Sequence, residues 1–484
     1  MDGIARPSFA PARGRSRMLC LALGVVAFAT ILPGRAVVPG QGWTPSSFGL
    51  VPSCAKYNPS GALFPGCTFT RRIRFHPSIP GLAYVGTLHT GPWVSTNGSA
   101  WAPLAPQCLS ELYTVDSTLR QTTQSELDVC SIEEIAFDPA DSRVIYATGY
   151  DVSSPLLPGV TIDPGGVYRS DNLGTSWTKV SKTVPNLRGA ALAVARRAGQ
   201  PPTIIAGAIQ HASWDIGTSK SLWISNDGGA RWRSVVLPAI KGCNTKTFLS
   251  TPLLVATLYV HPRNPDVVYA ATNGGLYQTS NRGRTWAPIL SACITKPISM
   301  GIAWGVAVTP DGKTIYAGLW DGRILMSPTT GTSQRTWRTV ATLDGTFVSH
   351  LLIDARDRTG KTLYAAALNK RAGKTNLSAG VYRVRLSSPS SVTLLPDSWA
   401  SGVNHSLGEL PRGPYNLVKD APAYWLAQST ADPDLLYLSQ AAGGVFWRSE
   451  GAPSPVPNVN PNGPPPAPPA LPPLPTATPT LGRR

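Results

Sequence analysis

Three tyrosine or tryptophan residues of this 484-residue chain are each followed directly by an aspartate: Tyr150-Asp151, Trp214-Asp215 and Trp320-Asp321. An aromatic ring stacks on a pyranose face and a carboxylate accepts hydrogen bonds from sugar hydroxyls, so these pairs are candidates for carbohydrate binding. Aspartate is also common in turns, and aromatic residues at strand ends often pack against neighbours, so a structural role stays open. His89 and His211 fall in equivalent loops and join the candidate binding residues, and for both a surface or hydrogen-bonded role is preferred to that of a catalytic base.

Two of these carboxylates are also the best candidates for catalysis. Glycoside hydrolysis requires two carboxyl groups roughly 5–10 Å apart, and Asp215 and Asp321 are the pair that the sequence offers. The chain contains no G-x-S-x-G elbow, phosphate-binding loop, H-E-x-x-H zinc motif or dinucleotide fingerprint. We therefore expect no cofactor and no metal, and a hydrolase remains the alternative to a non-catalytic binding role.

A second motif, spaced Ser/Thr-x-Asp/Asn-x-Gly-x-x-Trp, predicts turns instead of chemistry. The Asp or Asn caps free backbone N–H groups, Gly supplies a positive φ, and Trp covers an apolar layer. A shortened copy spans residues 95–101, a stretched copy spans 327–337, and the last repeat keeps Ser449 and Gly451. The complete copies are Ser170-Asn172-Gly174-Trp177, Ser225-Asp227-Gly229-Trp232 and Thr279-Asn281-Gly283-Trp286.

These turns belong to a longer repeat. A strand ending in Tyr-Ala or a close variant occurs at Tyr84, Tyr146, Ile205, Tyr269, Tyr316, Tyr364 and Tyr437. Most copies are followed by a loop and a second apolar strand. Four short strands per unit, at a period above about 40 residues, are typical of propeller blades. We therefore predict an all-β fold, a single seven-bladed β-propeller of four-stranded antiparallel blades, over residues 73–451.

Over residues 73–451 the chain resembles the BNR or Asp-box repeat family, which includes sialidases, sortilin-type receptors, xyloglucanase-type glycoside hydrolases and the photosystem II assembly factor. The resemblance implies that the boxes stabilise turns on the rim opposite the functional face. Seven units match the assembly factor better than the six blades of a sialidase. The WDIG around Asp215 is similar to the DIGG stretch that carries a catalytic acid in xyloglucanase-type enzymes, but Thr218 replaces the second Gly. The sialidase Arg-Ile-Pro signature is broken in residues 71–80.

The order of strands in a blade also predicts which loops bind. If the strands run A to D from the axis outward, the box lies at the C–D turn, and the B–C and D–A loops share the opposite face. Several B–C loops are long, at 149–166, 209–221 and 368–380. Long irregular loops on a rigid scaffold commonly carry binding residues, so we expect the ligand on that face.

The flanking segments predict export. Residues 1–36 have the pattern of a signal peptide, Arg-rich and then apolar, with cleavage expected after Ala36. Residues 37–72 are expected to lend a strand to the last blade and close the ring. Residues 452–484 hold 13 prolines, which predicts an extended, disordered tail that serves as a solvated end, a wall-spanning stalk or a docking segment.

Six cysteines remain after the signal peptide, and an even number in an exported chain favours disulfides. Several connectivities are compatible with the sequence, and we expect the pairs Cys54–Cys67, Cys108–Cys130 and Cys243–Cys293.

The formal charge of +17 favours anionic partners. The basic residues are scattered and no nucleic-acid-binding motif accompanies them, so general surface charge is the preferred interpretation and nucleic acid is not an expected partner. The sequence predicts an exported monomer without a transmembrane span in its mature form. We expect a non-catalytic binding or scaffolding module at the cell envelope, with a glycan or an envelope protein as ligand.

Overall fold

The computed structural model describes most of the repeat region. The described residues are 43–45, 70–87, 91–98, 100–104, 131–150, 165–184, 187, 189–208, 222–238, 255–272, 274–291, 303–330, 335–369, 380–395, 423–440 and 444–451. They all lie in the second of two compact units, residues 38–484. Within them, no helix is long and apolar enough to cross a membrane.

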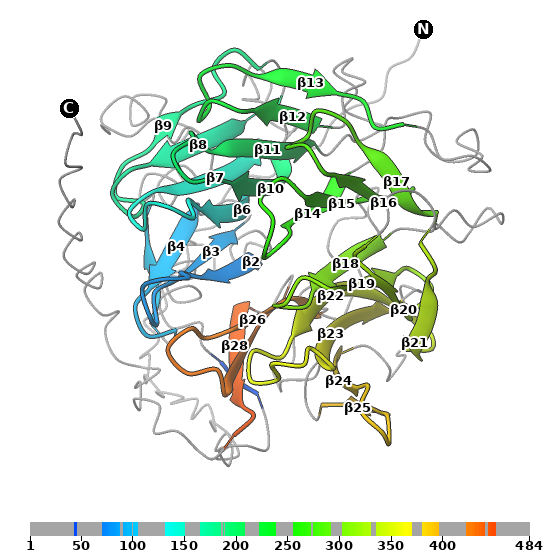
Figure 1. Cartoon of the computed structure of the whole chain (residues 1–484). Coiled ribbons are helices and arrows are strands. Elements are labelled where there is room, and N and C mark those ends of the chain that lie inside the picture. Colours follow the sequence, from blue (N-terminus) through cyan, green and yellow to red (C-terminus); the bar gives the residue numbers. More distant parts are fainter. Residues whose placement is uncertain are drawn as a thin grey trace, which may run out of the picture. The chain divides into compact units, whose positions relative to one another are not determined.

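Seven four-stranded antiparallel sheets form a seven-bladed β-propeller (Figure 1), which confirms the predicted fold. The innermost, or A, strands are β2 (Thr70–Phe75), β6 (Ser131–Phe137), β10 (Gly189–Ala195), β14 (Val255–Val260), β18 (Ala303–Val308), β22 (Thr346–Ile353) and β26 (Ala423–Gln428). Each A strand contacts those of both neighbouring blades, and β26 contacts β2. The ring is therefore closed around a common axis.

The other strands follow outward in each blade. The B strands are β3 (Ala83–Thr87), β7 (Ile145–Tyr150), β11 (Thr203–Ala208), β15 (Val268–Thr272), β19 (Thr314–Leu319), β23 (Thr362–Asn369) and β27 (Leu435–Gln440). The C strands are β4 (Pro92–Ser95), β8 (Gly166–Ser170), β12 (Leu222–Ser225), β16 (Gly275–Thr279), β20 (Arg323–Pro328), β24 (Gly380–Arg385) and β28 (Gly444–Ser449). The outer, or D, strands are β5 (Ala102–Pro103), β9 (Thr178–Lys179), β13 (Arg233–Val235), β17 (Ala287–Ser291), β21 (Arg338–Thr342), β25 (Ser391–Leu394) and β1 (Thr44–Pro45).

The seventh blade is completed from the other end of the chain. Strand β1 pairs antiparallel with β28, with Thr44 opposite Trp447 and Pro45 opposite Phe446. Trp43, just before β1, is buried among residues of blades 6 and 7. Shared strands of this kind remove a free sheet edge and hold the first and last blades together.

The repeated Tyr-Ala positions all fall on B strands, where both faces are covered by neighbouring blades. All seven are at most 2% exposed: Tyr84, Tyr146, Ile205, Tyr269, Tyr316, Tyr364 and Tyr437. Tyr84, for example, packs with Ile132 and Tyr168 of blade 2 and donates a hydrogen bond to the carbonyl of Leu173 at 3.1 Å. Burial on both faces explains why the B strands are almost uninterrupted apolar runs instead of alternating ones.

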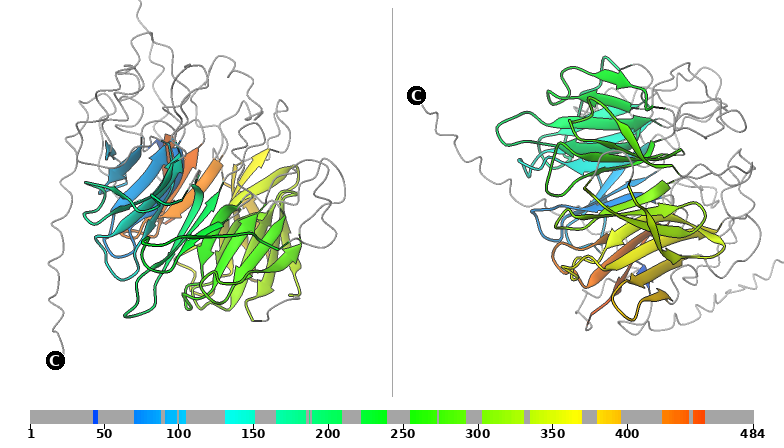
Figure 2. Two further views of the ribbon diagram at one scale, coloured as in Figure 1. Left: turned by 90° about the horizontal axis from the view of Figure 1, so that it is seen from above. Right: turned by 45° about the vertical axis from the view of Figure 1, so that its right-hand side comes forward.

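The antiparallel order gives the ring two faces. The A–B and C–D turns lie on one side, here called the box face, and the B–C and D–A connections begin and end on the other, here called the loop face (Figure 2). The complete boxes all lie at C–D turns of the box face, in blades 2, 3 and 4.

The box turns share one hydrogen-bond pattern. In blade 3, the Ser225 hydroxyl donates to Asp227 Oδ1 at 2.8 Å and accepts from the Gly229 N–H at 2.8 Å. Asp227 Oδ1 also accepts from the backbone N–H of Arg231 at 2.9 Å. Equivalent bonds join residues 170–176 in blade 2 and 279–285 in blade 4. The turns are thus capped by their own side chains.

Glycine is required in these turns for two reasons. Gly229 and Gly283 have φ of +102° and +78°, where a side chain is unfavourable. A Cβ on Gly283 would also lie 2.5 Å from Ile224 Cδ1 in the preceding blade. The box therefore fixes a turn and also allows close contact between blades.

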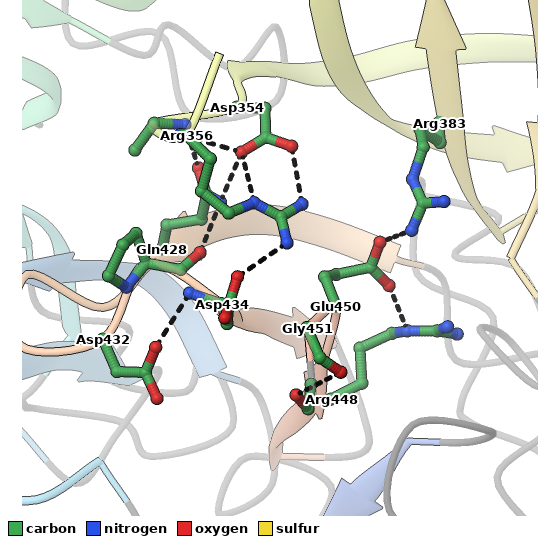
Figure 3. Close-up of polar contacts among 12 residues, drawn as sticks. Asp354, Arg356, Arg383, Gln428, Asp432, Asp434, Arg448, Glu450 and Gly451 are labelled. Atoms are coloured by element: carbon green, nitrogen blue, oxygen red, sulfur yellow. Dashed lines mark hydrogen bonds and ion pairs between the residues drawn. The ribbon is translucent and has the colours of Figure 1, made fainter. Parts of the chain in front are cut away.

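Ion pairs join blades 6 and 7 on the box face (Figure 3). Arg356 Nη2 contacts Asp354 Oδ2 at 2.6 Å, and its Nη1 contacts Asp434 Oδ1 of blade 7 at 2.9 Å. Gln428 donates to Asp354 Oδ1 at 3.1 Å. Burial opposes ionisation of Asp354, but the hydrogen bonds from Arg356 and Gln428 outweigh it and lower the pKa of this carboxyl to about 2.

A second carboxylate of this junction lies inside the remnant of the blade 7 box. The side chain of Glu450 is fully buried and contacts Arg383 of blade 6 and Arg448, the latter with 2.5 Å between Nε and Oε1. The Tyr364 hydroxyl donates to Glu450 Oε2 at 3.0 Å. Paired charges thus connect the two blades on the box face.

Candidate functional site

Every A strand has a β-bulge near its loop-face end. The register shifts occur between Thr70 and Ile73, Ile132 and Glu134, Gly189 and Ala191, Val255 and Thr257, Ala303 and Gly305, Val348 and His350, and Ala423 and Trp425. Bulges interrupt the ladder, redirect side chains and are common beside functional sites. The same end of the axis is therefore irregular in all seven blades.

A buried ionic cluster, Arg72, Arg74 and Glu134, occupies the axial strands beside these bulges. Arg72 contacts Glu134 of blade 2 at 2.7 Å, donates to the carbonyl of Ala256 in blade 4, and lies over the Trp425 ring of blade 7 at 4.7 Å. Because blades 1 and 4 are separated by two others, this one side chain spans the axis. Arg72 and Glu134 are both almost fully buried.

Arg74 completes the pairing of Glu134. Its Nε and Nη2 donate to the two carboxylate oxygens at 2.8 and 2.7 Å, a two-pronged geometry. Burial alone would raise the pKa of Glu134, but the charges of Arg74 and Arg72 lower it below its usual value. A carboxyl held ionised in this way is unsuited to donate a proton as a general acid.

His350 also has a structural role. Its ring stacks on Trp425 at 3.6 Å between centroids, and its Nδ1 accepts the backbone N–H of Leu426 at 3.1 Å. Burial, together with the positive charges of Arg74 and Arg72, holds the pKa of His350 well below its ordinary value. The imidazole is neutral and buried, so it packs and does not act as an acid at neutral pH.

An aromatic cluster lies on the loop face between blades 5 and 6. Trp320, in the B–C turn of blade 5, stacks on Phe347 of β22 with 4.4 Å between ring centroids and 15° between planes. Trp304 of β18 meets the same Phe347 edge-on, with centroids 5.6 Å apart. Both tryptophans are half-buried, and the Trp304 indole N–H has no acceptor among the described residues.

Asp321, the other half of the predicted pair, is held by its own turn. Its Oδ1 accepts the backbone N–H of Arg323 at 3.1 Å, and its Oδ2 lies 2.7 Å from both Nε and Nη2 of that arginine. A carboxylate engaged this way supports the turn.

The remaining predicted site residues lie at or beyond the limits of the described part. Tyr150 ends β7, and its side chain is outside the described residues. Asp151, Trp214, Asp215, His89 and His211 are also outside, as are Cys54, Cys67, Cys108, Cys130, Cys243 and Cys293. Their roles and the disulfide pairing stay predictions, as do the signal peptide and the Pro-rich tail.

Sequence reasoning missed the ionic cluster and the residues packed on it. A signal was available, because the segments TRRIRF and SIEEIAF place charged residues inside apolar strands. Buried charges in a strand require partners. The sequence alone does not show which strands face one another across the axis, so the partners of these charges could not be predicted.

Comparison with known proteins places the fold but not a family. No family model and no curated protein matches the sequence. The structure is similar to the GH74 xyloglucanase from Xanthomonas campestris, with a TM-score of 0.52, 18% identity, and coverage of 87% of this chain and 54% of that one. It is also similar to a GH74 enzyme from Niastella koreensis, with a TM-score of 0.51, 15% identity, and coverage of 78% and 52%.

The chain spans about half the length of each enzyme. At these identities the similarity shows the propeller fold, and neither activity nor ligand follows from it.

Proposed function

We propose that this chain is an exported, non-catalytic β-propeller that binds a glycan on its loop face and serves as a binding or scaffolding module of the cell envelope. The observation that carries the proposal is the aromatic cluster of Trp304, Trp320 and Phe347. Half-buried tryptophans at the end of a rigid scaffold provide flat apolar surface for a pyranose ring.

The environments of the described carboxylates support a role without catalysis. The acid of a glycosidase needs a raised pKa, and its second carboxylate must be free to act on the sugar or a water. Glu134 has a lowered pKa and two arginine partners, and Asp321 is bound to Arg323. Neither environment matches the chemistry of hydrolysis.

The second candidate is a glycoside hydrolase with Asp215 and Asp321 as its carboxyl pair. The similarity in fold to GH74 enzymes favours it, together with the position of Asp321 on the loop face. An envelope protein as the ligand is the other alternative to a glycan.

We also propose that the ring is of the Asp-box type. The shared hydrogen bonds of the turns in blades 2, 3 and 4 support this assignment. Export is supported by the N-terminal sequence pattern and by the even number of remaining cysteines.

The test is a glycan-binding panel run beside a reducing-end assay on the same sugars. Trp320→Ala should weaken binding about tenfold, the value of one aromatic stacking contact. Trp232→Ala, which removes the same type of side chain on the box face, should leave binding unchanged. Release of reducing ends by the wild type that Asp321→Asn abolishes would establish the hydrolase instead. Binding to an envelope protein and to no glycan would refute the choice of ligand.

A further inference from the structure

The box face of blades 3 to 6 is strongly basic at its surface. Counting the A–B and C–D turns and the strand ends that flank them, it presents nine exposed basic side chains and one exposed carboxylate, Asp311, among the described residues. The basic side chains are Arg197, Arg231, Arg263, Arg284, Lys313, Arg338, Arg358, Lys361 and Arg385. On the same face of blades 7, 1 and 2, Asp171 is the one exposed charged side chain of the described part.

Most of this charge is not neutralised within the described part of the fold. Arg197 and Arg231 form ion pairs with Asp266 and Asp227. The other seven form no ion pair with any described residue. Internal pairing therefore accounts for two of nine charges, and the remaining excess faces solvent. The nine residues are called the basic rim below.

Like charges are also close together on this face. Arg233, half-buried at the start of β13, donates through Nη2 to the carbonyl of Gly283 in the blade 4 box at 2.7 Å. Burial, and then the neighbouring positive charge of Arg284, lower the pKa of Arg233. Two cations held this close favour an anion between or above them.

The arrangement of the basic rim indicates the shape of its partner. The residues come from consecutive blades, β10 to β25, which follow an arc of the ring (Figure 1), and their turns all end on one face. Seven of the nine are arginines, whose planar guanidinium forks pair with phosphate oxygens. Separate cations spread along an arc of one face can each contact a different anion of a planar array.

We propose that the basic rim docks the propeller on the phosphate headgroups of an anionic phospholipid bilayer. The loop face is then directed away from the bilayer, and the aromatic cluster is free to take its ligand. This inference concerns the opposite face from the proposed glycan site, so either can fail alone.

The experiment is co-sedimentation of the full chain with vesicles of phosphatidylglycerol and phosphatidylcholine, compared with vesicles of phosphatidylcholine alone. The test variant carries Arg284→Gln, Lys313→Gln, Arg358→Gln and Lys361→Gln. Each charge near an anionic surface is worth about fivefold in binding, so this variant should bind about 10²- to 10³-fold more weakly. Every variant carries the same residues 1–36 as the wild type, so differences in vesicle binding come from the substituted residues of the basic rim.

Two single variants make the test specific. Asp311→Asn removes the one exposed carboxylate that the described residues place beside the basic rim, and it should strengthen binding about fivefold. Lys182→Gln, which removes a positive charge outside the box face, should change binding less than about twofold. Raising the salt to about 0.5 M should release the wild type from the vesicles, because exposed charges are then screened.

Three results would overturn the proposal. The first is wild-type binding that is equal on vesicles with and without phosphatidylglycerol. The second is a four-site variant that binds as the wild type does. The third is tight, rim-dependent binding to soluble inorganic polyphosphate with none to the anionic vesicles, which would show that the partner is a linear polyanion.

Discussion

Replacing Glu134 by glutamine removes the counter-ion of two axial arginines while keeping the side chain's size. Its carboxylate accepts three short hydrogen bonds from Arg72 and Arg74 and a fourth from the Ile135 backbone N–H at 3.1 Å. Its side chain is 1% exposed, so solvent cannot replace the lost charge. Removing one partner of a buried ion pair costs about 3–5 kcal/mol.

The expected shift in melting temperature follows from the size of the ring. Unfolding entropy is about 2.1 cal/mol/K per residue, or roughly 0.8 kcal/mol/K for a unit of about 400 residues. A loss of about 3–5 kcal/mol therefore lowers Tm by about 4–6 °C, measured by differential scanning calorimetry at neutral pH. Glu133→Gln is the matched control, because its partner Arg71 is more exposed than Arg72, with 19% against 5%.

This comparison distinguishes a structural cluster from a ligand site. If Arg72 and Arg74 were arranged to hold an anionic ligand, losing Glu134 would free them at little loss in stability. A Tm within about 1 °C of the wild type, or a shift no larger than that of Glu133→Gln, would refute the reasoning.

Other predictions concern the turns and the blade junctions. Because the folded pKa of Asp354 is about 2 and its ordinary value is 3.8, its contribution to stability is present above pH 4 and is lost as the pH falls toward 2. Asp354→Asn should therefore flatten this part of the curve of Tm against pH. An unchanged curve would count against the ion pairs. Trp177→Ala, at a site 2% exposed, should lower the free energy of unfolding measured with denaturant by about 3–5 kcal/mol. Trp232→Ala, at a half-buried site, should lower it by less, and equal losses at the two sites would contradict this order. Gly283→Ala places a methyl group at a positive φ and in close contact with a neighbour, whereas Gly199→Ala places one at a positive φ in open space. Gly283→Ala should therefore lower Tm by more than Gly199→Ala, and the reverse order would contradict the role of packing.

The sequence predicted the ring because its repeats are local. Each Tyr-Ala strand is defined by its own composition, and each box caps its own turn, so spacing alone locates the blades. Tyr316 and Tyr364 illustrate this, since their neighbours in the chain alone predict a repeated strand at each, and both lie on B strands.

The candidate site was harder to predict because its contacts are distant in sequence. Trp320 stacks on Phe347 of the next blade, and Arg72 reaches Glu134 of the next blade and Ala256 across the axis, so these contacts exist only when the blades are packed together. One local signal was available for Asp321. The run Asp321-Gly322-Arg323 is typical of a tight turn, and it explains why this carboxylate bonds to its own turn.

Hydrogen exchange with a sugar identified by the panel tests the central claim most directly, combined with mass analysis of the recovered sugar. The account predicts slower exchange at residues 319–323 and 346–350, unchanged exchange at the box turn 226–232, and an intact sugar. Protection confined to the box turn, or a cleaved sugar, would contradict it.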